Sequence, residues 1–230
     1  MKTPLTRKKI QHHLSYSLWK YALLIAIAIF GWNIIFSVTQ YRAPEYKKIV
    51  LGIYAYGDET NINAYMEQVR VDLMSDMEEM NAMYIMPDEA QGAMILTTRI
   101  AARECDIYIL PRAQFQSYAA SGAFMPLDVV APSLLAELEA AGVSLSRGNR
   151  ALDSKPPEPY ETVTATGEKH QYAIPCADLP GISAMLQCDA SDMYIGVFFE
   201  TGNDDNVLKF LGQFVRDMLV EPIMIELPAE

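Results

Sequence analysis

Residues 48–54 read KIVLGIY, an apolar run that follows one lysine and precedes the turn residues 56–60, YGDET. A run without polar interruption is typical of a strand that is buried on both faces, because alternation appears only where one face meets water. Strands of this kind occur in parallel sheets that helices cover on both sides. The run therefore predicts the first strand of an α/β domain.

The chain beyond this strand alternates between helical and extended patterns. Helices are predicted at 61–79, 88–103, 113–120, 133–141 and 204–220. Strands are predicted at 82–86, 106–110 and 193–200, with a hairpin at 161–166 and 169–175, whereas residues 124–128 suit an extended turn. Strands separated by helices of about 10–15 residues predict parallel, right-handed connections. The expected architecture is α/β with a mainly parallel sheet.

Apolar residues at helical spacing predict which faces of the helices are buried. In the first helix these residues are Ile62, Tyr65, Met66, Val69 and Leu73. In the second they are Met94, Ile95 and Ile100, and in the last they are Val207, Leu208, Leu211, Phe214, Val215 and Met218. Thr60 or Asp58 is expected to cap the first helix, and Ser133 to cap the helix that it begins.

Upstream of the domain, residues 21–36 read YALLIAIAIFGWNIIF, and the uncharged run continues to Tyr41, a length of 21 residues. As a helix it spans roughly 30 Å, the thickness of the hydrocarbon core of a bilayer. The sequence thus predicts a single membrane-spanning helix at 16–40, after a basic tail at 1–15 and before a linker at 41–47. Residues 48–230 then form the domain.

The direction of this helix follows from its flanks. Lys2, Arg7, Lys8 and Lys9 precede it without any acid, so the N-terminus is expected in the cytoplasm and the domain outside it. A cleaved secretory signal is the main alternative. Residues 37–40, SVTQ, make a poor cleavage site, which favours an uncleaved signal anchor.

The charge of the domain limits its partners. The chain has 18 Lys and Arg and 29 Asp and Glu, and five of the basic residues but none of the acids precede residue 41. The rest of the chain therefore carries a net charge of −16. Nucleic acids and anionic lipid surfaces require a positive protein surface, so neither is an expected partner of the domain.

Ligands of parallel sheets bind beyond the carboxyl ends of the strands, which here means loops 55–60, 87–90 and 111–116. Tyr56, Asp58 and Glu59 follow the first strand, together with Tyr54, and Arg112 follows the third. An aromatic face beside carboxylates suits a sugar, and Arg112 suits an anion. The alternatives are turn and cap residues for the first group, and a salt bridge to a loop acid for Arg112.

Metal binding and disulfide bonding have weaker signals. Met74, Met77, Met80, Met83 and Met86 recur every third residue, a pattern that fits either Cu(I) binding or filling of the core. Because the series runs from a predicted helix into a predicted strand, its members do not share one face, which favours the core. Of the three cysteines, Cys105 is expected to be a core thiol, whereas Cys176 and Cys188 are open to pairing outside the cell.

Catalysis has no support in the sequence. The nucleophile elbow, the Walker loop and the H-E-x-x-H motif do not occur, and His170 is the one histidine outside the N-terminal tail. The protein is therefore expected to be neither an enzyme nor the carrier of a metal or another cofactor.

Four segments resemble the extracellular solute-binding proteins of bacterial ABC transporters, sugar-binding receptors among them. They are IVLGIYAYGDETN at 49–61, ECDIYILPRAQFQSYAASGAFMPLD at 104–128, KHQYAIPC at 169–176 and MYIGVFFETGNDDNVLKFLGQFV at 193–215. The later part of the family pattern L-x-x-x-G-x-[FL]-x-P-L-D is matched by Gly122, Phe124, Pro126, Leu127 and Asp128. Ala173 stands where the family's y-G-I-P strand has its usual glycine.

The resemblance implies a single lobe of a periplasmic-binding-protein-like fold. In complete family members most of a second lobe lies between the last two segments, whereas here only residues 177–192 separate them. It also implies a function: an anchored module that binds a small molecule, such as a sugar or a peptide, and works with the permease of an ABC transporter. The alternative is a ligand-free interaction domain that docks onto a membrane partner.

Overall fold

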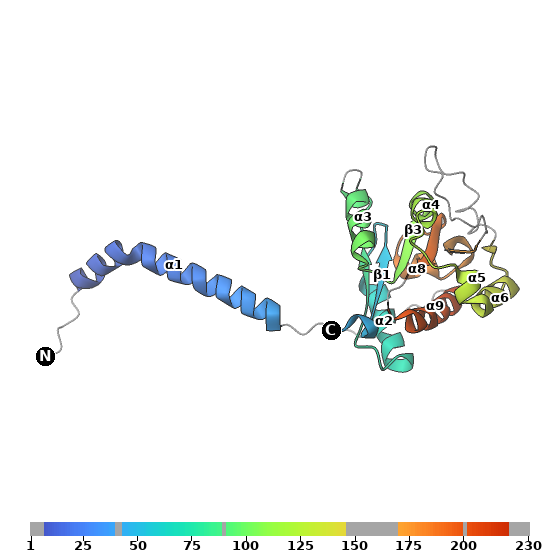
Figure 1. Cartoon of the computed structure of the whole chain (residues 1–230), viewed down its shortest axis with the longest axis horizontal. Helices are drawn as coiled ribbons and strands as arrows, with labels where there is room; N and C mark the ends of the chain where they lie inside the picture. Colours follow the sequence, from blue (N-terminus) through green and yellow to red (C-terminus); the bar gives the residue numbers. More distant parts are fainter. Residues whose placement is uncertain (1–6, 40–42, 89–90, 146–169, 200–201, 221–230) are drawn as a thin grey trace. The chain divides into compact units, whose positions relative to one another are not determined.

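The computed structural model describes residues 7–39, 43–88, 91–145, 170–199 and 202–220. The chain divides into two compact units, Met1–Arg42 and Ala43–Glu230. The first contains one helix, α1 (Arg7–Thr39), and the second is an α/β domain, whose α-helices and strands β1 and β3 are labelled in Figure 1.

Helix α1 has 33 residues, and its segment Leu18–Thr39 is long and apolar enough to cross a membrane. Two polar side chains of this segment bond to carbonyl groups of the helix itself. Asn33 donates from Nδ2 to the carbonyl of Ile29 over 2.8 Å, and the hydroxyl of Thr39 donates to the carbonyl of Ile35 over 2.7 Å. Such internal bonds suit a hydrocarbon environment, where water is not available as a partner.

The domain is built on a five-stranded mixed sheet with the order β2-β1-β3-β5-β4. The strands are β1 (Lys48–Ile53), β2 (Glu79–Tyr84), β3 (Ile107–Pro111), β4 (Ile174–Pro175) and β5 (Met193–Val197). Strand β1 runs parallel to both β2 and β3, whereas β5 runs antiparallel to its neighbours β3 and β4. Four of the five described strands therefore point the same way, and the predicted α/β fold with a mainly parallel sheet is confirmed.

Helices cover the sheet on both faces. They are α2 (Thr60–Leu73), α3 (Gly92–Ala102), α4 (Arg112–Ala120), α5 (Leu127–Val130), α6 (Pro132–Ala140), α8 (Ile182–Leu186) and α9 (Asp204–Leu219). Short 3-10 turns lie at η1 (Glu45–Lys47) and η3 (Cys176–Asp178).

Strand β1 shows how the two cores arise. Ile49, Leu51 and Ile53 pack into a core shared with α2, α6 and α9, whereas Val50 and Tyr54 pack into a second core with α3 and α4. Residues 49–53 are all buried, as the uninterrupted apolar run predicted.

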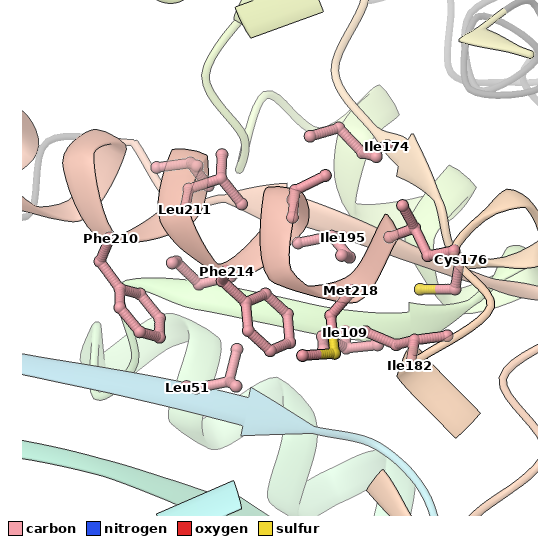
Figure 2. Packing of buried hydrophobic residues seen from close by; sticks show 14 of the residues in the cluster. Leu51, Ile109, Ile174, Cys176, Ile182, Ile195, Phe210, Leu211, Phe214 and Met218 are labelled. Atoms are coloured by element: carbon pink, nitrogen blue, oxygen red, sulfur yellow. The ribbon is translucent and has the colours of Figure 1, made fainter. Parts of the chain in front are cut away.

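In the first core, α9 lies across the sheet. Phe210 and Phe214 of α9 project toward Leu51 of β1 (Figure 2), and Leu211 belongs to the same core. The predicted apolar stripe of this helix is confirmed, with Leu208 only partly buried.

Several predicted boundaries are wrong. Helix α2 ends at Leu73 rather than near residue 79, and β2 begins at Glu79 rather than at Ala82. The reason is that Met74 and Met77 already turn into the core, after which burial alternates along the strand. Leu73 is consequently 49% exposed.

Helix α3 also differs from its prediction. It begins at Gly92, where the backbone packs so closely on the carbonyl of Met86 that a Cβ would lie 2.3 Å from its oxygen. Because the helix starts in this position, Leu96 and Ile100 face the core, whereas Met94 is 65% exposed and Ile95 is 39% exposed. The inward orientation expected for Met94 and Ile95 is therefore wrong.

Two further differences lie around residue 130. Helix α5 begins at Leu127, within the segment expected to be extended, and α6 begins at Pro132 without a side-chain cap, so Ser133 is not its cap. Proline suits the first helical position, because the amide that it lacks would have no partner there. Of the predicted hairpin, residues 161–169 lie outside the described residues.

We expect Gly196→Ala to lower the free energy of unfolding by about 1–3 kcal/mol, because a Cβ there would lie 2.6 Å from the ring of Phe115. That ring is buried and stacks on Phe124, so it has little room to move. Gly212→Ala in α9 is the matched control: its Cβ would meet Arg216 at an ordinary 3.5 Å, and alanine favours a helix by about 1 kcal/mol. Chemical unfolding of the full chain in micelles measures both, and equal losses would contradict this packing.

The three cysteines are free thiols that differ in exposure: Cys105 and Cys176 are buried and Cys188 is half-buried. Burial raises the pKa of Cys105 to about 12 and raises that of Cys176 further. Because the thiolate is the reactive form, we expect iodoacetamide to label Cys188 of the folded chain well before the other two. Peptide mass spectrometry after timed quenching measures the order, and equal labelling rates in the folded state would contradict the burial.

Candidate functional site

The two covered faces of the sheet leave its two ends as the places where polar side chains gather. At the carboxyl end, the loop after β1 presents Tyr56 with 62% of its surface exposed, followed by exposed Asp58 and Glu59. Asp58 Oδ1 accepts a hydrogen bond of 2.6 Å from the amide of Thr60. Hydrogen bonding by the side chain of Thr60, and then by its amide, lowers the pKa of this carboxyl group. Asp58 thus binds the first amide of α2 from the position before Glu59, the N-cap residue, whose own side chain makes no capping bond.

This loop rests on β2 and α8. At Gly57 a Cβ would lie 2.4 Å from the ring of Tyr84 and 2.7 Å from the carbonyl oxygen of Leu186, so only glycine fits there. The hydroxyl of Tyr84 donates to that same carbonyl over 2.7 Å. Burial raises the pKa of Tyr84, and the nearby Cys188, Asp58 and Glu59 raise it further. The two loop acids therefore lie on the β2 side of the carboxyl end.

Arg112 begins α4 directly after β3, at the same end of the sheet. Its Nε lies 3.1 Å from Oδ1 of Asp192, and its Nη2 donates to the hydroxyl of Tyr194 over 3.0 Å. The guanidinium also lies 5.8 Å from the centre of the Tyr194 ring. The predicted salt bridge to a loop acid is confirmed. Arg112 therefore lies on the β5 side of this end, whereas the loop of Gly57 packs against β2 and α8.

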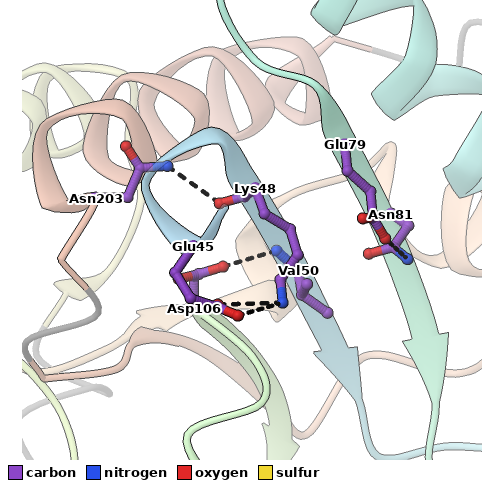
Figure 3. A network of polar contacts seen from close by, with 7 residues as sticks. All are labelled: Glu45, Lys48, Val50, Glu79, Asn81, Asp106 and Asn203. Carbon is purple, nitrogen blue, oxygen red and sulfur yellow. Dashed lines mark hydrogen bonds and ion pairs between the residues drawn. The ribbon is translucent and has the colours of Figure 1, made fainter. Parts of the chain in front are cut away.

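The amino end of the sheet holds a cavity of about 610 Å³ that the sequence analysis missed. It is lined by residues of β1 and β2, by Asp106 directly before β3, by η1, and by the end of α3 with the two residues after it. The lining residues are Glu45, Lys48, Val50, Glu79, Asn81, Met83, Ala102, Arg103, Glu104 and Asp106. Figure 3 shows the polar side chains from these strand starts.

The cavity exists because α3 stops short of the strand starts. The helix covers the β2 side of the sheet down to Ala102 and ends at Arg103, whose φ of 55° is left-handed. Val50 and Asn81 lie opposite each other in the register of β1 and β2, at the part of this face that opens into the cavity. A helix one turn longer would fill this space.

Polar contacts hold the strand starts in place (Figure 3). The carboxylate of Asp106 accepts from the amide of Val50 over 2.7 Å, and the amide of Asp106 donates to the carbonyl of Val50 over 2.9 Å. Asn203 donates from Nδ2 to the carbonyl of Lys48 over 3.1 Å, which ties the start of α9 to β1. The buried Asp106 therefore extends the ladder between β1 and β3 by a side-chain bond.

A smaller cavity of about 310 Å³ lies between α2, α8 and α9. Here the hydroxyl of Tyr65 donates to Oδ2 of Asp217 over 2.7 Å, and Gln213 Nε2 donates to the other carboxylate oxygen over 2.9 Å. Both oxygens of this acid therefore have partners within the domain.

Within the described residues, no three His, Cys, Asp or Glu side chains are grouped to hold a metal ion. Met74, Met77 and Met80 are buried in the first core, as the core-filling interpretation of the methionine series predicted, whereas Met86 is 63% exposed. Nδ1 of His170 lies 2.9 Å from the carboxylate of Asp128.

Comparison with known proteins gives little further identification. No family model matches the chain, and no curated protein matches it. Among solved structures it is similar to an extracellular solute-binding protein family 1 from Alicyclobacillus acidocaldarius subsp. acidocaldarius, with 15% identity and a TM-score of 0.35. That similarity covers 56% of this chain and 27% of the other, so it spans about a quarter of that protein's length.

Proposed function

We propose that this protein is a membrane-anchored, extracytoplasmic module that binds a small molecule such as a sugar or a peptide. The observation that carries the proposal is the exposed ring of Tyr56 beside the carboxylates of Asp58 and Glu59, at the carboxyl end of a parallel strand. Loops at this end are where ligands of such sheets bind. The module has no catalytic role.

In this proposal the N-terminal helix determines the side of the membrane on which the domain lies. The apolar segment Leu18–Thr39 spans the bilayer as an uncleaved signal anchor, and the basic tail at 1–15 keeps the N-terminus in the cytoplasm. The linker at 41–47 then leads to the domain at 48–230 on the outer side. Its acidic surface remains solvated there and attracts neither nucleic acid nor anionic lipid.

The site residues have distinct roles. The ring of Tyr56 stacks on the apolar face of a sugar, and the carboxylates of Asp58 and Glu59 accept bonds from its hydroxyls. Arg112 contributes a positive group on the β5 side of the same end, where Asp192 and Tyr194 hold its guanidinium in one orientation. A single lobe gives such a ligand one wall, so the module presents its ligand to a partner, and the permease of an ABC transporter fits that need.

The alternative is an interaction domain that docks onto a membrane partner without any ligand. Exposed apolar side chains favour it: Tyr56 after β1, Met86 after β2, and Met94 and Ile95 at the start of α3. Methionine adapts to irregular protein surfaces, and exposed apolar groups of this kind occur at interfaces.

A ligand screen decides between the two functions. The full chain, in micelles of a polyoxyethylene detergent that carries no sugar, is heated with sugars, oligosaccharides, peptides and amino acids. A ligand at 100 times its dissociation constant adds about 2.7 kcal/mol, which raises the melting temperature by several degrees. We expect one chemical class to give this shift. A cooperative melt without any shift, together with co-purification of a membrane protein, would favour docking.

Variants locate the ligand. We expect Tyr56→Ala to weaken binding of the identified ligand by a few-fold to about tenfold, since the lost stacking amounts to about 0.5–1.5 kcal/mol. Tyr46→Ala is the matched control, because Tyr46 is also an exposed tyrosine, 60% against 62%, but lies in η1.

Asp58→Asn tests the charge and keeps the bond to the amide of Thr60, since asparagine has the same acceptor oxygen. It should weaken the ligand without moving the melting temperature of the free chain. Unchanged affinity in both Tyr56→Ala and Asp58→Asn would remove the site from this end of the sheet.

A further inference from the structure

We propose that the cavity at the amino end of the sheet binds a small organic cation that carries primary ammonium groups. This site is separate from the carboxyl end and does not depend on the function proposed above. Its volume of about 610 Å³ is in the range of small-molecule sites.

The charges that line the cavity select a cation. Four lining residues are acidic, Glu45, Glu79, Glu104 and Asp106, and two are basic, Lys48 and Arg103. The formal balance of the lining is thus negative by two charges. Helix α3 adds to it, because its C-terminal carbonyls carry partial negative charge and Ala102 ends the helix at the cavity wall.

The four acidic residues differ in the hydrogen bonds and ion pairs that their carboxylates make within the domain. Asp106 accepts from the amide of Val50 at 2.7 Å and is buried. Glu45 lies 3.1 Å from the ammonium of Lys48. Both therefore serve the structure.

Glu79 is different. Its carboxylate accepts a hydrogen bond of 3.2 Å from the side-chain amide of Asn81, which is neutral and does not compensate the negative charge. Among the described residues, no Lys, Arg or His pairs with this carboxylate. The free charge of Glu79 favours a ligand that carries a cationic N–H group.

Glu104 supplies the second contact, from the segment that follows α3. It lies 3.4 Å from Arg99, a longer ion pair than the others at this end, and its side chain is 47% exposed. Since Glu79 belongs to β2 and Glu104 follows α3, a ligand with two ammonium groups reaches both walls. A metal ion fits less well, because no three such ligands converge within the described part of the chain.

Lys48 is the competing cation. It stands opposite Glu79 in the parallel register of β1 and β2, while its ammonium lies on Glu45. Removing its charge therefore makes the cavity more negative. The proposal thus predicts opposite effects for the two neighbours in register, which a purely structural role would not produce.

Isothermal titration calorimetry of the full chain in micelles, at low ionic strength, tests the site with 1,4-diaminobutane. The diol and the dicarboxylic acid of the same carbon length, 1,4-butanediol and succinate, are the controls for charge. We expect the diamine alone to bind, and added salt to weaken it. Absence of diamine binding, or equal binding of the diol, would overturn the proposal.

Variants place the diamine in the cavity. We expect Glu79→Gln to weaken its binding at least about tenfold and Lys48→Met to strengthen it. Glu137→Gln, which removes an exposed acid of α6 paired with Arg216, is the control and should leave affinity unchanged.

Glu104→Gln provides a second test if Glu79→Gln does not fold, as judged by circular dichroism. Tyr56→Ala should leave the diamine bound, which separates this site from the one at the carboxyl end. Wild-type affinity in both the Glu79 and Glu104 variants would show that the cation binds elsewhere.

Discussion

The burial of the sheet on both faces is the constraint on which the rest of the domain depends. Strand β1 sends Leu51 toward α9 and Val50 toward α3 and α4, so neither face can carry an exposed polar group without loss of a core. Functional side chains are therefore restricted to the strand ends and the loops that leave them. The two proposed sites follow from that restriction, one at each end of the sheet.

The two ends differ in how they are closed. At the carboxyl end the loops pack onto the domain: Gly57 lies against Tyr84 and Leu186, and Arg112 is held by Asp192. The side chain of Tyr56 remains exposed there and forms part of an open surface rather than of a cavity. At the amino end α3 stops at Ala102, and a cavity remains between charged walls. The first end thus suits a ligand shared with a partner, and the second suits a ligand held by this chain alone.

The sequence predicted the elements whose pattern is local. The run at 48–54 identified β1, and the stripe of 204–220 identified α9, because burial alone determines both patterns. It failed at residues 74–80, where the regular methionine spacing continues across the end of α2 and conceals the turn. Methionine suits a helix, a turn and a strand alike when it fills a core, so its spacing carries little information.

The candidate sites likewise differ in whether a local sequence pattern indicates them. Tyr56, Asp58, Glu59 and Arg112 were found because each follows a predicted strand directly. The amino-end cavity was missed because Glu79 and Glu104 come from separate elements and meet only through the register of β1 with β2 and the point at which α3 ends. A strand predicted to begin at Ala82 also left Glu79 inside a helix.

The proposed function requires an extracytoplasmic domain, so the side of the membrane on which the domain lies is the central claim. Val71 is an exposed residue of α2. Val71→Cys in a chain that also carries Cys188→Ser places one accessible thiol on the domain, and Thr3→Cys in the same background reports on the tail. Intact cells are treated with a membrane-impermeant maleimide. The account predicts labelling of Val71→Cys before lysis and of Thr3→Cys only after it, and the reverse order would contradict it.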